Sequence, residues 1–177
     1  MAALVLDFRS PLPDRLYWDA SFLVHAVYPP GRYHRECYGF LERLSTSPTV
    51  SYLSVLALDE AIFALLQLKI SEEQPERGFW EIYRANPGAI QPYFGELRRL
   101  VDRLSSDPRI RVVGLESTSL LIGLDFMERY SLLPRDALHL SIMARYNIDS
   151  IVTTDEDFWP VDTLRIFTCN PRLLARR

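Results

Sequence analysis

Short apolar, β-branched runs alternate with longer helical patterns from residue 16 to residue 168. Strands are predicted at residues 16–18, 49–54, 109–114, 149–155 and 164–168. Helical patterns occupy most of the intervals, at residues 20–28, 32–47, 55–70, 117–131 and 134–147. Strands that alternate with helices in this way favour helices layered on a mainly parallel sheet. The sequence therefore predicts an α/β fold.

The length of the chain suits one domain. Single domains commonly contain about 50 to 250 residues, so we expect one domain over all 177 residues, numbered 1–177. The helical pattern weakens where proline and glycine recur between residues 75 and 88, and we predict a mostly helical insertion around residues 71–105. Residues 1–14 precede the first predicted strand and are assigned no role.

Composition argues against several classes of protein. The apolar-rich run at residues 53–68 contains two acids and is shorter than the ~20 residues that a membrane-spanning helix needs. No basic segment precedes the apolar patch near the N-terminus, unlike a secretory signal. Cys37 and Cys169 lack the spacing of a zinc site or a disulfide framework. We therefore expect a cytoplasmic protein with no membrane segment.

Acidic residues occur at the ends of two predicted strands. Asp19 comes directly after the first of them, and Asp155 ends the fourth. In open α/β sheets the functional crevice lies outside the carboxyl ends of the strands, so both side chains are expected there. Glu60 and Asp136 lie in helices and reach the same crevice if those helices pack on the sheet.

Converging carboxylates would need a cation between them. Two like charges ~4 Å apart cost on the order of 4 kcal/mol at an effective dielectric near 20. Arg135, beside Asp136, is one candidate cation. A divalent ion is a better one, because Mg²⁺ and Mn²⁺ prefer hard oxygen ligands and no His/Cys set suits zinc. Carboxylate-bound ions of this kind are typical of phosphodiester hydrolysis, where they activate a water and neutralise the leaving oxygen.

Each acid also has a purely structural interpretation. Asp19 can cap the helix that follows it, and Asp155 can cap a turn. Glu60 can be a half-exposed helix residue, with Asp59 competing for the inward position. Asp136 is favourable near a helix N-terminus without any site. Taken singly, none of these acids identifies a function.

Four segments, taken together and in order, resemble a PIN-domain ribonuclease, the fold of the toxin in VapBC-type toxin-antitoxin pairs. They are "YWDASFLV", "SVLALDEAIFALL", "LLPRDALHLSIMARYNIDSIVTTDEDF" and "LRIFT". The third is the strongest part, because an Asp-Ala-Leu-His-Leu helix leads into a strand that ends in "VTTDEDF". The resemblance spans about residues 16–168 and implies a three-layer α/β/α fold with a central, mainly parallel sheet.

The resemblance also implies an activity and partners. It implies that Mg²⁺ or Mn²⁺ is bound by Asp19, Glu60, Asp136 and Asp155, with Asp157 as a candidate fifth ligand and Ser21 as a small hydroxyl residue near the metal. The implied reaction is metal-dependent endonucleolytic cleavage of RNA. Such toxins often form homodimers and are inhibited by an antitoxin whose C-terminal segment fills the groove. Residues 71–105 look longer than in the compact toxins, so the groove or the partner surface can differ.

Several other residues receive structural interpretations. His139 lies three residues after Asp136 on roughly the same helical face, and a packed histidine is the favoured interpretation. For Asp157 taken alone, a solvated turn residue is favoured, and Tyr17, Trp18 and Trp159 are favoured as core or edge residues. The basic candidates for RNA phosphates are Arg32, Arg35, Arg98, Arg99, Arg103 and Arg135.

Three classes of function stay open on the sequence. The first is the metal-dependent nuclease, either a toxin or an enzyme of RNA processing or decay. The second is a receiver-like or phosphohydrolase domain, which is disfavoured because the one lysine, Lys69, ends a helix and Asp19 has no Asp two residues on. The third is a non-catalytic module that binds RNA or protein, which we expect to have lost at least one of the four acids.

Overall fold

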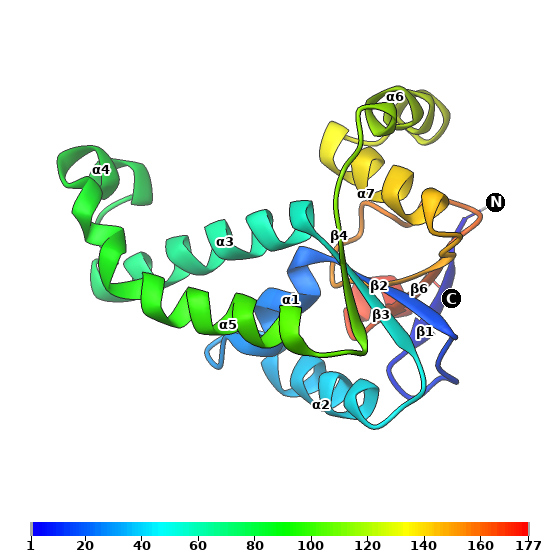
Figure 1. The fold of residues 1–177 in the computed structure, drawn as a ribbon, viewed down its shortest axis with the longest axis horizontal. Helices are drawn as coiled ribbons and strands as arrows, with labels where there is room; N and C mark the ends of the chain where they lie inside the picture. The colour runs from blue at the N-terminus through cyan, green and yellow to red at the C-terminus, as the bar shows by residue number, and fades with distance from the viewer. Residues whose placement is uncertain (1, 177) are drawn as a thin grey trace.

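A parallel β-sheet forms the centre of the molecule (Figure 1). The computed structural model describes residues 2–176, so Met1 and Arg177, the ends of the expected domain, lie outside it. Within these residues the strands are β1 (Leu4–Asp7), β2 (Arg15–Trp18), β3 (Val50–Ser54), β4 (Ile110–Val113), β5 (Ser150–Val152) and β6 (Arg165–Thr168). Their order across the sheet is β1-β6-β5-β2-β3-β4, and all neighbours are parallel. The predicted α/β fold is confirmed.

Helices cover both faces of this sheet. They are α1 (Ala20–Val27), α2 (His34–Ser45), α3 (Val55–Glu73), α4 (Phe79–Ala85), α5 (Phe94–Ser106), α6 (Thr118–Tyr130), α7 (Pro134–Arg145) and α8 (Pro171–Leu174), with a 3-10 helix η1 at Pro87–Tyr93. Side chains alternate across a strand. Leu16 and Trp18 accordingly join the core under α1, α2 and α3, whereas Tyr17 joins the core under α7. The arrangement has three layers, as expected.

Strand β1 is the strand that the sequence did not reveal. It pairs with β6, with Val5 opposite Ile166, and forms one edge of the sheet. Val5 is 3% exposed and Leu4 is 57% exposed, so this short strand has one well-buried side chain and almost no period-two signal. Residues in the unassigned stretch 1–14 therefore extend the sheet.

Residues 71–105 are largely helical and project away from the sheet. Figure 1 shows α3 and α5 running together toward α4 at their far end. Lys69 of α3 bonds Glu96 of α5 at 3.3 Å, and Leu97 and Leu100 of α5 pack against the core on the α3 side. That this segment is an insertion relative to other proteins stays a prediction.

Helix α6 rests on α7 and is otherwise exposed. A Cβ atom at Gly123 would meet Cδ2 of Leu138 at 3.3 Å, so the glycine lets the two helices approach closely. On its outer surface Leu120, Leu121 and Leu124 are more than half exposed. An apolar face of this kind is typical of a contact with another protein.

Two further expectations from the sequence concern membrane-spanning helices and the two cysteines. Across residues 2–176, every helix is too short or too polar to traverse a lipid bilayer. Cys37 and Cys169 carry free thiols, and their Sγ atoms lie 3.8 Å apart.

Candidate active site

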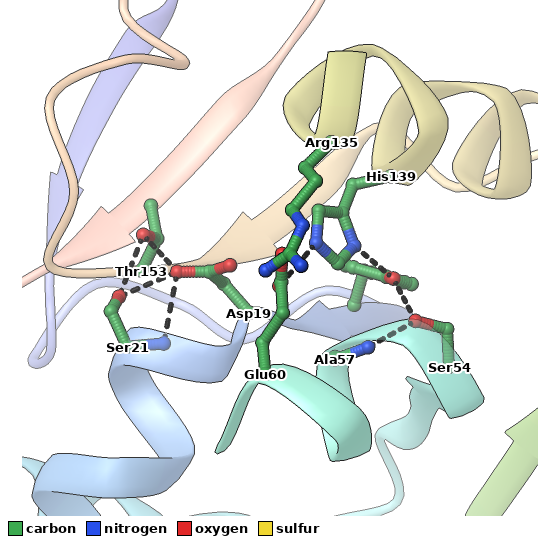
Figure 2. Close-up of polar contacts among 9 residues, drawn as sticks. Asp19, Ser21, Ser54, Ala57, Glu60, Arg135, His139 and Thr153 are labelled. Carbon is green, nitrogen blue, oxygen red and sulfur yellow. Dashed lines mark hydrogen bonds and ion pairs between the residues drawn. The ribbon is translucent and has the colours of Figure 1, made fainter. Parts of the chain in front are cut away.

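Asp19 stands where β2 ends and α1 begins, and is 6% exposed. Its Oδ2 atom accepts hydrogen bonds from Ser21 N at 3.2 Å, Ser21 Oγ at 2.5 Å and Thr153 Oγ1 at 2.7 Å (Figure 2). All three bonds go to one oxygen, while the other points toward Glu60. The carboxylate therefore caps α1 and also faces a neighbouring acid.

Glu60 approaches Asp19 from the second turn of α3. Its side chain is 16% exposed, whereas Asp59 is exposed, so Glu60 takes the inward position. Oε2 lies 2.9 Å from His139 Nε2, and Oε1 lies 3.4 Å from Nη1 of Arg135. Burial raises the pKa of Glu60, but the hydrogen bond and charge of His139 and the charge of Arg135 outweigh it, so the pKa is lowered. Glu60 is therefore ionised at neutral pH.

His139 connects Glu60 to the core of the protein. The residue is 1% exposed, and its Nδ1 atom lies 2.7 Å from the hydroxyl of Tyr17. That hydroxyl is 2.5 Å from Ser54 Oγ, which accepts from Ala57 N at 2.9 Å and so caps α3. Sequence reasoning favoured a packed histidine, and the structure shows that it is both packed and in contact with the site.

Asp136 lies half-buried in the first turn of α7. Burial raises the pKa of its carboxyl group, and the negative charges of Asp155, Asp157 and Asp19 raise it further. His139 opposes this shift, yet the pKa still reaches about 6. Burial first, and the neighbouring negative charges second, therefore disfavour the ionised form of this carboxyl group.

The three acids after β5 are Asp155, Glu156 and Asp157, and their side chains have different partners. Burial and the charges of Asp157 and Asp19 raise the pKa of Asp155, although backbone N–H groups oppose the shift. Asp157 N donates to Asp155 Oδ1 at 3.1 Å, as in a capped turn. Glu156 instead bonds Arg176 at 2.9 Å and Arg172 at 3.6 Å. Asp155 and Asp157 therefore act on the site, and Glu156 ties this loop to the C-terminal residues.

The donor set fits a metal ion. Among residues 2–176, one group of three has ligand atoms that all lie within 4.8 Å of each other, namely Asp19, Glu60 and His139. Asp136 and Asp155 stand outside that tight group, but their charges interact with Asp19 and with each other. Carboxylate oxygens dominate the set, which suits a hard divalent cation.

A cavity of about 400 Å³ adjoins the acids. Asp136 and Asp157 line one part of it, and Trp159 and Arg176 line another. The Arg176 guanidinium lies 4.8 Å from the centre of the Trp159 ring. Negative and positive side chains thus face the same space. Arg176 was not among the six arginines that the sequence suggested for RNA phosphates, and none of those six lines this cavity. Of the six, Arg135 contacts a site acid, Glu60.

The comparisons with known proteins agree with this geometry. A family model described as "PIN domain" matches residues 16–163. Ribonuclease VapC6 of Methanocaldococcus jannaschii is 21% identical to this chain over 154 residues, which make up 87% of this chain and 97% of that protein. The resemblance inferred from the sequence is thereby confirmed.

Two solved structures share the fold. VapC20 of Mycobacterium tuberculosis, described as a sarcin-ricin loop cleaving toxin, matches with a TM-score of 0.53 and 18% identity, covering 81% of this chain and 92% of its own. A toxin-antitoxin complex from Klebsiella pneumoniae matches with a TM-score of 0.54 and 15% identity, covering 84% and 94%. The chain belongs to the PIN domain family, and its homologues include VapC-type ribonuclease toxins.

Proposed function

We propose that this protein is an endoribonuclease that hydrolyses RNA phosphodiester bonds with the help of Mg²⁺ or Mn²⁺. The observation that carries the proposal is the gathering of acids beyond the carboxyl ends of β2 and β5, where the pKa of Asp136 is about 6. Such a concentration of negative charge is stabilised by a bound divalent cation. The family, whose homologues include ribonucleases, supplies the substrate class.

In this proposal the acids of the site would be the ligands of the ion. The ligands are Asp19, Glu60, Asp136 and Asp155, and Asp157 is a fifth candidate. A divalent ion bound there supplies an activated water and neutralises the leaving oxygen. Ser21 and Thr153 fix the Asp19 carboxylate, which lowers the cost of ordering it around a cation. The exposed Arg135 is placed to contact an RNA phosphate.

Cleavage assays test the nuclease proposal directly. We expect purified protein to cut a mixed RNA substrate in Mg²⁺ or Mn²⁺ and to be inactive in EDTA. Asp136→Asn should reduce the rate by at least roughly 100-fold, since even indirect metal contacts contribute about 10-fold to 100-fold. Asp102→Asn is the matched control, because Asp102 is exposed on α5, and it should leave the rate unchanged.

Two results would contradict the proposal. Equal inactivity of wild type and Asp136→Asn on several RNAs, together with no metal binding by calorimetry, would leave the RNA- or protein-binding module as the better explanation. Cleavage that persists in EDTA would exclude the metal-dependent mechanism. Both outcomes are measurable with the same preparations.

We also propose that the protein is the toxin of a toxin-antitoxin pair. The support is the VapC6 relative and the fold shared with the Klebsiella pneumoniae toxin-antitoxin complex. A groove of about 390 Å³ between α1, α2, α3 and α5 has apolar walls that include Leu65 and Leu97, with Arg99 and Arg103 also lining it. This chemistry suits an amphipathic antitoxin segment with acidic side chains. A neighbouring gene whose product blocks cleavage would separate this role from RNA processing or decay.

The exposed apolar face of α6 supports a homodimer. Leu121 and Leu124 are 68% and 57% exposed, and Leu133, just beyond the helix, is 67% exposed. We expect light scattering to report a dimer for wild type and a monomer for Leu121→Glu combined with Leu124→Glu, because burying these charges is costly. Leu4→Glu is the control, since Leu4 is equally exposed at 57% but lies on β1. A monomeric wild type would overturn the dimer.

A further inference from the structure

We propose that Tyr17 and His139 are positioning residues that hold the Glu60 carboxylate in the orientation required for metal binding. The inference rests on the proposed function for its consequence, since it assigns Glu60 to the metal site. Neither Tyr17 nor His139 needs to touch RNA or the ion. Their role follows from a continuous set of buried hydrogen bonds that begins and ends on α3.

These hydrogen bonds connect four elements of the fold, β3, α3, β2 and α7. Ser54, at the end of β3, caps α3 by accepting from Ala57 N at 2.9 Å (Figure 2). Its Oγ atom lies 2.5 Å from the Tyr17 hydroxyl on β2. That hydroxyl lies 2.7 Å from Nδ1 of His139 on α7, and Nε2 of the same ring lies 2.9 Å from Glu60 Oε2. Glu60 belongs to α3, so the cap and the carboxylate of one helix are joined through the core.

The donor and acceptor properties of each group determine where the hydrogens lie in these hydrogen bonds. An ionised carboxylate only accepts hydrogen bonds, so Nε2 of His139 must carry the hydrogen that faces Glu60. The partner of the other ring nitrogen fixes the ring orientation and the tautomer. The Tyr17 hydroxyl donates its one hydrogen to Ser54 Oγ, so toward Nδ1 of His139 its oxygen is an acceptor.

Burial makes this arrangement rigid. Tyr17, Ser54 and His139 are each no more than 1% exposed, so water does not readily replace their hydrogen bonds. The Phe158 ring packs edge-on against the imidazole, with ring centres 6.3 Å apart, and restricts its rotation further. His139 also lies one turn after Asp136 on α7, so the same contacts fix the helix that presents that acid.

The Tyr17→Phe variant tests the role of the hydroxyl. We expect Mn²⁺, followed by its electron paramagnetic resonance signal, to bind about 10-fold to 100-fold more weakly, because His139, the partner of Glu60, loses the hydrogen bond that fixes its ring. Cleavage should recover when Mn²⁺ is raised to saturation. Tyr52→Phe is the matched control: Tyr52 is 4% exposed, lies opposite Tyr17 in the sheet, and contacts Arg111 instead. Its Mn²⁺ affinity should equal that of wild type.

Substitutions of His139 distinguish positioning from general damage to the core. The amide of His139→Gln can still donate toward Glu60, whereas His139→Leu cannot. We expect the glutamine variant to keep more of the Mn²⁺ affinity than the leucine variant, at equal folded fraction by circular dichroism. Equal losses in both variants would overturn the proposed role of the Nε2 donor.

The ¹⁵N nuclear magnetic resonance signals of the His139 ring can be measured without metal or RNA. In ¹⁵N spectra of metal-free protein, we expect His139 to carry a hydrogen on Nε2 in wild type and to show a changed ring spectrum in Tyr17→Phe. If wild type binds no Mn²⁺ but the ring responds in this way, the proposed function fails, whereas the contact by which Tyr17 orients the ring beside Glu60 stands. If wild type binds Mn²⁺ and Tyr17→Phe binds it equally well, the positioning inference fails and the nuclease proposal stands.

Discussion

The Asp136→Asn variant is expected to unfold at a higher temperature than wild type in EDTA at pH 7.5, although it loses metal-dependent cleavage. Burial and the charges of Asp155, Asp157 and Asp19 raise the pKa of Asp136 from 3.8 to about 6. A shift of this size corresponds to roughly 3 kcal/mol. Solvent screening around the half-buried group reduces the gain to on the order of 1 to 2 kcal/mol. The melting temperature should therefore rise by roughly 2 to 8 °C.

The size of this stabilisation depends on pH. Because the folded pKa of Asp136 is raised, wild type is penalised increasingly as the pH rises from about 4 to about 6, and fully above that. The stability difference should thus shrink toward zero as the pH approaches 4. Asp102→Asn makes the same charge change at an exposed position and should not shift the melting temperature. A less stable Asp136→Asn at pH 7.5 would show that neighbouring groups already compensate the charge, and would remove the electrostatic argument for a cation.

Parallel topology explains why much of the site was predictable. Once residues 16–18 and 149–155 are recognised as parallel strands, Asp19 and Asp155 must emerge at the same edge of the sheet. In the structure β2 and β5 are neighbours, and Trp18 lies opposite Val152. Glu60 was placed less firmly, because helical periodicity alone did not separate it from Asp59. Helix α3 shares a core with α1, and Glu60 bonds His139 and Arg135 of α7, which are tertiary contacts.

The unpredicted features depend on partners that are remote in sequence. His139 reaches Glu60 across 79 residues and Tyr17 across 122 residues, and no local pattern encodes either contact. Glu156 differs from its two acidic neighbours because arginines near the C-terminus bond it. Strand β1 depends on β6 at the other end of the chain. Local patterns thus predicted the order of elements and the acids, and tertiary contacts determined how the carboxylates are held.

Manganese affinity is expected to fall roughly tenfold for each pH unit below about 6. A proton on Asp136 competes with the cation for the same carboxyl group, and the pKa of that group is about 6. The raised pKa of Asp155 acts in the same direction. Above pH 7 the Asp136 carboxyl group is largely ionised, so the affinity should level off. Titrations of Mn²⁺ at pH 5, 6, 7 and 8 by electron paramagnetic resonance would measure the profile.

The Asp136→Asn variant assigns this pH dependence to its source. An amide does not titrate in this range, so the variant should bind Mn²⁺ more weakly at pH 8 and lose the part of the step near pH 6 that belongs to residue 136. If the fall in Mn²⁺ affinity at low pH were unchanged in the variant, the titrating ligand would be assigned to Asp155 instead. The pKa of Asp155 is raised by burial and by the charges of Asp157 and Asp19. A flat wild-type profile down to pH 5 would exclude both acids as ligands. The profile therefore tests the metal site without reference to any RNA, because the competition is between a proton and a cation for one crowded group of carboxylates.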